Sequence, residues 1–133
     1  MIVVVYDALK NGPWREQTAF LIDDQRDPVI IGASVHRAFA MARVDVPQPD
    51  YDTSNKATYP SLEISGAKTR SGFMKEARNV GIQQQSLDIT VTPYANRGAR
   101  GGFTAIDSKA RVLRNPDDRA LGEAVLDAFL DAE

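Results

Sequence analysis

Two segments of the chain carry the same residue pattern at a constant offset of 90 positions. Each holds a large aliphatic residue, a glycine, a valine, an alanine and a phenylalanine at helical spacing, at positions 31, 32, 35, 38 and 39 and again at 121, 122, 125, 128 and 129. The apolar positions predict one buried stripe on each helix. A glycine inside a helix costs about 1 kcal/mol relative to alanine, so two at the same register indicate a shared packing requirement. We predict that Gly32 and Gly122 each lie against a sheet or another backbone, where a side chain would clash.

Both predicted helices follow residues that favour a helix start. The side chain of Asp27 can accept hydrogen bonds from free backbone N–H groups, and Pro28 tolerates the first helical position. At the second helix, Asn115 is the expected cap and Pro116 the expected first residue. The two aspartates that follow favour the positive end of the helix dipole. The C-terminal helix is therefore the most clearly predicted element.

Apolar runs and alternating patterns predict the strands. β-Branched residues favour a strand at Ile2–Tyr6, and the run Thr18–Ile22 could pair with it. Strict alternation predicts a strand with one buried face at Leu87–Thr92. Further strands are expected at Tyr59–Ile64, where Pro60 favours an edge or a strand start, at Arg78–Gln83 and at Phe103–Ile106. Other expected segments are an exposed loop at Val44–Ala57, a short helix at Thr69–Ala77 and a glycine- and arginine-rich turn at Ala95–Gly102.

Together these elements predict an α+β fold, with a mostly antiparallel sheet of about five strands and two principal helices packed on it. The 133 residues, of which 43% are hydrophobic and 26% charged, fit a single globular domain spanning residues 1–133. The lack of cysteine excludes disulfides and thiolate sites and fits a reducing cytosol. The apolar start is too short for a signal-peptide core or a membrane span, so we expect a cytoplasmic protein with no membrane partner.

No residue pattern points to catalysis or to a cofactor. His36 is the only histidine, so it cannot form a two-histidine metal site, and no serine lies in a Gly-x-Ser-x-Gly turn. The segment Gly98–Gly102 lacks the spacing and the ending of a phosphate-binding loop, and a connection between strands is the simpler interpretation. We therefore expect no enzyme, no metal and no cofactor, and a structural or surface role for His36.

Charge is distributed unevenly along the chain. The net charge is −2, and the acidic excess lies in residues 1–63 and 102–133. Residues 64–101 reverse the balance, with only Glu76 and Asp88 against six basic residues: Lys68, Arg70, Lys75, Arg78, Arg97 and Arg100. A basic face can bind nucleic acid, although nucleic-acid-binding modules usually carry an overall basic excess. A nucleic-acid-binding or regulatory module using residues 68–100 is thus one alternative, and simple solvation of exposed faces is another.

Three stretches of the second half carry a resemblance to a known family. Residues 115–125, Asn-Pro-Asp-Asp-Arg-Ala-Leu-Gly-Glu-Ala-Val, are similar to its acidic lead-in to a Leu-Gly-x-Ala closing helix. Residues 87–93, Leu-Asp-Ile-Thr-Val-Thr-Pro, with Gly-Gly-Phe at 101–103, are similar to its strand ending in proline, basic turn and return strand. Residues 65–73, Ser-Gly-Ala-Lys-Thr-Arg-Ser-Gly-Phe, are similar to its Ser-Gly-x-Lys-Ser-Trp segment, with the aromatic displaced to Phe73 and the tryptophan absent. The chain thereby resembles the immunity proteins of bacterial contact-dependent growth inhibition systems.

The resemblance implies an α+β protein that binds the toxin end of its own cell's inhibition protein, commonly a nuclease, and blocks the toxin's active site. Immunity proteins of this kind do no chemistry, and the leading interpretation involves no direct contact with nucleic acid. Such families vary most at the toxin-facing surface. The resemblance therefore transfers no contact residue to this chain.

Charge suggests a candidate contact surface instead. A nuclease site is cationic because it must hold phosphate, so an acidic inhibitor gains both steering and complementarity. The predicted loop offers Asp45, Asp50 and Asp52 beside Tyr51, an aromatic type favoured as an interface anchor. We predict that these four residues contact the basic toxin domain. A solvated acidic loop is the simpler alternative.

Overall fold

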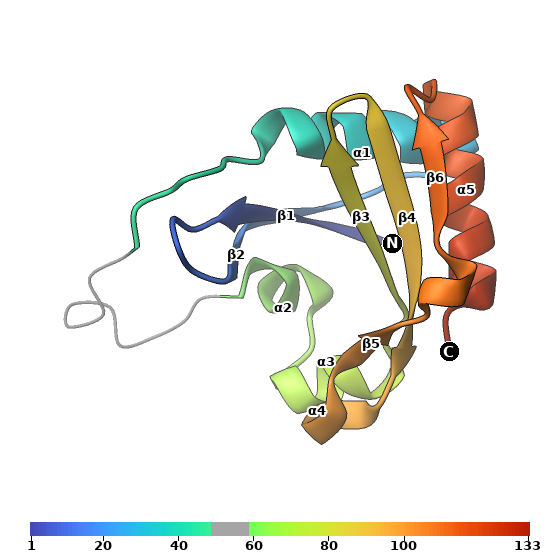
Figure 1. Cartoon of the computed structure of the whole chain (residues 1–133). Coiled ribbons are helices and arrows are strands. Elements are labelled where there is room, and N and C mark those ends of the chain that lie inside the picture. Colours follow the sequence, from blue (N-terminus) through green and yellow to red (C-terminus); the bar gives the residue numbers. More distant parts are fainter. Residues whose placement is uncertain (49–58) are drawn as a thin grey trace.

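The computed structural model describes residues 1–48 and 59–133, which form an α+β fold with two antiparallel sheets (Figure 1). The first sheet is a hairpin of β1 (Ile2–Ala8) and β2 (Trp14–Leu21). Its register shifts between Val5 and Tyr6, which leaves Gln17 as an extra residue on β2. Such a bulge redirects side chains locally. The first two predicted strands are confirmed, and both are longer than the apolar runs that indicated them.

The second sheet is built around β4 (Asp88–Asn96). One edge of β4 pairs with β3 (Asn79–Gln85), and the other edge is shared by β6 (Arg111–Arg114) and β5 (Phe103–Ala105). Along β4 every second residue from Ile89 to Ala95 is buried. The alternation that predicted one buried face is therefore confirmed.

The two principal helices, α1 (Pro28–Met41) and α5 (Asp118–Asp131), cross through their first turns. A Cβ atom on Gly32 would overlap the backbone carbonyl of Asp118, and a Cβ atom on Gly122 would overlap the backbone carbonyl of Pro28. The two contacts are equivalent under the 90-residue offset. The predicted close approach is confirmed, and its partner is the opposite helix rather than a sheet.

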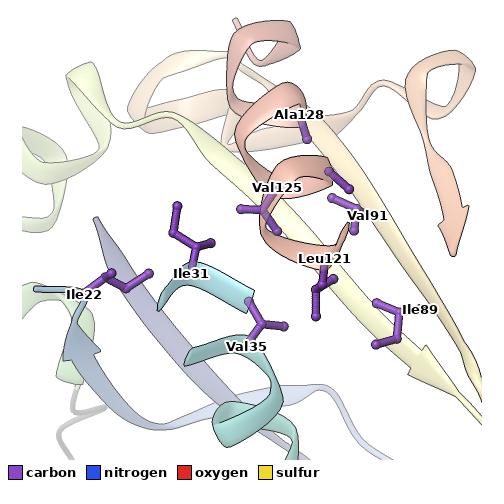
Figure 2. Packing of buried hydrophobic residues seen from close by; sticks show 9 residues of the cluster. Ile22, Ile31, Val35, Ile89, Val91, Leu121, Val125 and Ala128 are labelled. Carbon is purple, nitrogen blue, oxygen red and sulfur yellow. The ribbon is translucent and has the colours of Figure 1, made fainter. Parts of the chain in front are cut away.

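The core lies where these helices meet the sheets (Figure 2). Figure 2 shows Leu121 and Val125 of α5 turned towards Ile89 and Val91 of β4, with Ile31 of α1 alongside. All five are buried. A buried Leu, Ile or Val contributes roughly 1.5–3 kcal/mol relative to exposure, so this cluster is a major source of stability for the fold.

Short helices occupy the connections. They are α2 (Pro60–Ser65), α3 (Arg70–Glu76), α4 (Gly98–Gly101) and the 3₁₀ turn η1 (Asp107–Lys109). Thr69 caps α3 by accepting a hydrogen bond from the Gly72 N–H, which confirms the predicted short helix. None of the helices in the described residues is long and apolar enough to cross a membrane.

Three predictions about the elements were wrong. The predicted strand Tyr59–Ile64 is the helix α2, because Pro60 takes the first helical position and Gly66 ends the helix in the left-handed region, with φ of 71°. The cap of α5 is Asp117, whose side chain accepts from the Ala120 N–H, while Asn115 sits in a turn. The turn predicted at 95–102 contains the end of β4 and the helix α4.

The α+β class, the antiparallel pairing and the two principal helices are confirmed. Within the described residues the strands number six rather than about five, and they divide between two sheets rather than one. The strand β6 was not predicted, since four residues with arginine at both ends carry almost no periodic signal.

Candidate functional site

A fully buried carboxylate organises the end of the β1–β2 hairpin. Asp7 accepts hydrogen bonds from Gln17 Nε2 at 2.7 Å and from Arg43 Nη2 and Nε at 2.6 and 3.1 Å, and Arg15 Nη2 lies 3.6 Å away. The hydrogen bonds from Arg43 lower the pKa of Asp7 below its usual range, against the opposing effect of burial. A buried charge is tolerated only when it is paired in this way. Asp7 therefore stays ionised and holds its neighbours in place.

The same network anchors the chain that follows α1. Gln17 Nε2 also donates to the carbonyl oxygen of Met41 at 2.9 Å, and the Ala8 N–H donates to the carbonyl oxygen of Arg43 at 2.8 Å. Val46 then continues beside β1, donating to Ala8 at 3.1 Å and accepting from Lys10 at 2.8 Å. An isolated parallel bridge between Leu9 and Val46 thus holds residues 43–46 beside the hairpin.

Asp45 is the one predicted contact residue within the described part of the chain. It is exposed, and its φ of 54° lies in the left-handed region, which aspartate tolerates better than most residues. Because Arg43 on one side and Val46 on the other are hydrogen-bonded to the hairpin, Asp45 is presented from a fixed backbone. Asp50, Tyr51 and Asp52 lie outside the described residues.

Two large apolar side chains are exposed at this end of the molecule. Trp14 is 62% exposed and Val44 is 73% exposed. Trp14 is paired across the hairpin with Ala8, whose N–H donates to the residue preceding Val44. We name Trp14 of the hairpin, with Val44 and Asp45 of the segment that is hydrogen-bonded to Ala8, the hairpin-end surface.

Sequence reasoning missed Trp14 and Asp7. A signal existed for each. The only tryptophan of the chain directly follows the turn cluster at 10–13, which favours exposure, and Asp7 shares the inward period of Val5 and Leu9 on β1.

A second polar cluster lies on the other face of the hairpin, against α2. Glu16 accepts from the Ser61 N–H and hydroxyl at 3.1 and 3.0 Å. Burial raises the pKa of Tyr6, with a smaller contribution from Glu16. Arg70 stacks 4.4 Å above the Tyr59 ring and donates to its hydroxyl at 2.9 Å. These contacts dock α2 and α3 onto the hairpin.

His36 lies at the crossing of the two principal helices. Its Nδ1 is 2.6 Å from Asp118 Oδ1, and both side chains are partly exposed. Asp118 is the residue whose carbonyl also lies against Gly32. Within residues 1–48 and 59–133 no three His, Cys, Asp or Glu side chains are grouped as metal ligands would be. The geometry gives His36 a contact between helices, in line with the predicted structural role.

The basic residues of 64–101 gather around α3 and α4, at the far end of β4 from Asp88. Asn96 joins the two helices: its Nδ2 donates to the Met74 and Ala77 carbonyls at 2.7 and 2.9 Å, and its Oδ1 accepts from the Gly98 N–H at 2.8 Å. Shallow hollows of about 410 and 390 Å³ lie on either side of this joint. Gly98–Gly101 forms a single helical turn that leads into β5, so the order of elements differs from that of a phosphate-binding loop.

Comparison with known proteins gives a fold without a function. No family model matches the chain, and no curated protein matches it. Among solved structures, it is similar to a protein of unknown function, NMB0488 from Neisseria meningitidis, with a TM-score of 0.73 and 17% identity over 99% of this chain and 88% of that one. At this identity the likeness shows a shared fold alone.

Proposed function

We propose that this protein is the immunity protein of a contact-dependent growth inhibition system, which binds its cognate C-terminal toxin domain in the cytoplasm and neutralises it without chemistry of its own. The observation that carries the proposal is the hairpin-end surface. It combines an exposed tryptophan, an exposed valine and a carboxylate on a backbone that the buried Asp7 network fixes.

The chemistry of this surface suits a tight protein contact. Tryptophan is among the residues most enriched at interface hot spots. A surface that is already ordered loses little conformational entropy on binding, so more of its contact energy appears as affinity. The segment carrying Val44 and Asp45 meets this condition because backbone hydrogen bonds hold it on both sides of Asp45.

Charge favours a basic partner of nuclease type. Asp45 is followed in the sequence by Asp50 and Asp52. A cationic phosphate-binding site would be complementary to these carboxylates and would attract them from a distance.

Several apolar residues of the stretches that carry the family resemblance lie in the core, whereas the residues of the hairpin-end surface are exposed. Ile89, Val91, Leu121 and Val125 belong to the stretches that resemble the immunity family, and all four are buried in the core. They specify the scaffold. The contact residues proposed for this chain lie outside those stretches, on the hairpin, where a family of immunity proteins would vary from one toxin to the next.

The test is binding and protection with the toxin domain encoded next to this gene. We expect a complex with a Kd of about 1 nM or below, because the inhibitor must outcompete a lethal activity, and survival of cells that express both proteins. Trp14→Ala should weaken the complex by about 2 kcal/mol, as expected for a buried aromatic anchor.

The matched control is Leu130→Ala. Leu130 is an exposed apolar residue on α5, 81% exposed, and it is remote in sequence from the hairpin. Its truncation should leave affinity within about twofold, since residues outside an interface contribute little. Absence of any complex between the folded protein and the toxin domain would refute the proposed function, and equal losses in the two variants would refute the proposed surface alone.

A further inference from the structure

We propose that the hollow between α3 and α4 is an anion site that binds the phosphate backbone of a single-stranded nucleic acid. The inference concerns a different surface from the hairpin end and does not depend on the proposed function. Four observations carry it. The cations of residues 64–101 have no carboxylate partner among the described residues, and Asn96 fixes the backbone beneath them. The hollow has no acidic residue in its lining, and Gly102 leaves the backbone at its rim accessible.

The cations around α3 and α4 differ from three of the four basic residues that follow them in the chain, Arg119 being the exception. Lys109, Arg111 and Arg114 each lie within 3.3 Å of a carboxylate oxygen. In the part of the chain that the structure describes, no carboxylate lies within 4.0 Å of the six basic residues of 64–101. All six are exposed. Their charges are thus not neutralised by a described carboxylate, while Arg70 donates to the Tyr59 hydroxyl and Arg78 to the Phe129 carbonyl oxygen.

The scaffold beneath these charges is fixed. Asn96 hydrogen-bonds to the end of α3 and to the start of α4, and the Arg97 N–H donates to the Gly102 carbonyl at 2.8 Å. The Asn96 N–H in turn donates to the carbonyl of Glu133 at 2.8 Å, which ties this end of β4 to the end of the chain. A ligand would therefore meet a preformed surface, without the cost of ordering it.

The two hollows differ in charge. The larger one, lined by Lys75 and Arg78, also has Glu76 and Glu133 in its wall. The hollow of about 390 Å³ between α3 and α4 has Arg70 and Arg100 and no acidic residue. It is therefore the better anion site.

The remaining lining of the α3–α4 hollow suits a nucleotide. Ser71 adds a hydroxyl donor for a phosphate oxygen, and Met74 adds an apolar surface for a sugar or base. At Gly102, where φ is 66°, a Cβ would meet nothing within 4 Å, so the backbone is open to an approaching ligand. One phosphate of a strand would occupy this hollow, and the next phosphates would lie within reach of Lys75 and Arg78 in the adjacent hollow.

A single strand fits this surface better than a duplex. Duplex recognition usually inserts a helix or a two-stranded ribbon into a groove. Here α3 has seven residues and α4 has four, and both are docked by Asn96 against β4. Electrostatic binding of single strands needs only a cationic path with some apolar surface. The net charge of −2 limits affinity, so we expect a Kd of order 1–10 μM at low salt.

The experiment measures fluorescence anisotropy of labelled 12-nucleotide oligo(U) and oligo(dT) with the full chain. Contact with about three phosphates predicts a slope of log K against log salt near −2, which means about 20-fold weaker binding at 200 mM than at 50 mM salt. Comparison of oligo(U) with oligo(dT) shows whether ribose or deoxyribose is preferred. Binding of either one more tightly than a duplex supports the site. A 12-base-pair duplex should bind less tightly than the single strands.

Arg70→Gln combined with Arg100→Gln removes the two cations of the hollow and should weaken binding at least about tenfold and reduce the salt slope by about 1–2. The control pair Arg26→Gln with Arg119→Gln removes the same charge from exposed positions elsewhere and should change affinity less than about twofold. Arg100→Lys, which keeps the charge, should retain most of the affinity.

Three results would overturn the inference. One is no binding of either oligonucleotide at 50 mM salt by the folded protein. Another is equal weakening by the control pair, which would mean diffuse attraction without a site. The third is equally tight binding of a 12-residue oligoglutamate peptide, which would point to an acidic protein partner.

Discussion

The buried carboxylate of Asp7 on β1 accepts two hydrogen bonds from Arg43, the second residue beyond the end of α1, with the shorter at 2.6 Å. The pair connects a buried residue of the hairpin to the surface, because the Arg43 side chain is itself 58% exposed. It therefore links the stability of the fold to the position of the segment that carries Asp45.

Arg43→Gln is expected to destabilise the protein clearly more than loss of the more distant Arg15, because it leaves the buried charge of Asp7 with Gln17 as its closest hydrogen-bond partner. Arg15→Gln is the matched control. Arg15 lies 3.6 Å from the same carboxylate and is partly exposed, so its loss should cost less than about 1 kcal/mol. Urea denaturation measures both. Equal losses would show that Arg43 has no special role.

Acid should remove this contribution. The folded-state pKa of Asp7 is lowered, so its ionised form stabilises the fold at pH values above the unfolded pKa, and the stabilisation is lost as the pH falls through the folded pKa. We expect the stability difference between the parent and Asp7→Asn to be constant above about pH 5 and to shrink below about pH 4. Urea melts between pH 7 and pH 2 provide the measurement.

Asp88→Asn is the control for the acid experiment. Asp88 pairs with Arg114 on the surface at 3.3 Å, and such pairs contribute roughly 0–1 kcal/mol. Its effect should be small at every pH. A stability difference for Asp7→Asn that persists unchanged to pH 2 would mean that the pKa of Asp7 is the same in the folded and unfolded states.

The helix crossing gives a third prediction. Gly122→Leu should destabilise the fold by at least about 1–3 kcal/mol, because the new side chain meets the backbone carbonyl of Pro28, which cannot move without displacing α1. Ala120→Leu, at an exposed position two residues earlier on α5, should change stability by less than about 0.5 kcal/mol. Thermal and urea melts of the two variants distinguish a specific clash from a general effect of leucine on this helix.

Local sequence signals were enough where one signal dominated. The paired glycines, the cap at Asp27 and the alternation in β4 each predicted a feature that the structure shows. They failed where two signals competed. Pro60 is compatible with a strand start and with a helix start, and only packing of α2 against the hairpin selects the helix.

The candidate site was less accessible to sequence reasoning than the fold. Asp45 was predicted from its charge, but its fixed backbone depends on hydrogen bonds from Ala8, Lys10 and Val46, which no local pattern encodes. Trp14 was overlooked because exposure of a large apolar residue is decided by what covers it. The hollow between α3 and α4 is formed by segments about 25 residues apart in the chain. The basic residues of 64–101 indicated a cationic surface, but the shape of the hollow could not be predicted from the sequence.

His36 provides a test of the expected lack of catalysis. His36→Gln keeps a donor that can reach Asp118, so we expect stability to change by less than about 1 kcal/mol and protection against the toxin to be retained. A growth assay and a urea melt on the same variant are sufficient. A folded variant that specifically loses protection would indicate chemistry at His36, and nearby carboxylates would then need to be tested.

The charge of the acidic segment leads to the last prediction, which concerns the rate of complex formation with the toxin domain. Association should slow as salt rises, because steering fields are screened beyond about 8–10 Å at ordinary ionic strength. Reversal of Asp45, Asp50 and Asp52 to lysine should lower the on-rate and weaken protection, whereas removal of Tyr51 should mainly raise the off-rate if it is a buried anchor.

The single variant Asp45→Lys separates the described residue from the other two. If the fixed backbone of Asp45 matters, this single variant should account for more than one third of the decrease in on-rate that the triple variant shows. The control is reversal of three acids near the other end of the hairpin, Asp23, Asp24 and Asp27, which changes net charge equally, with a urea melt to establish that loss of the Asp27 cap leaves the protein folded. Surface plasmon resonance at several salt concentrations gives the rates. Should the triple variant bind and protect like the parent while this control fails, the toxin contact lies at residues 23–27 instead.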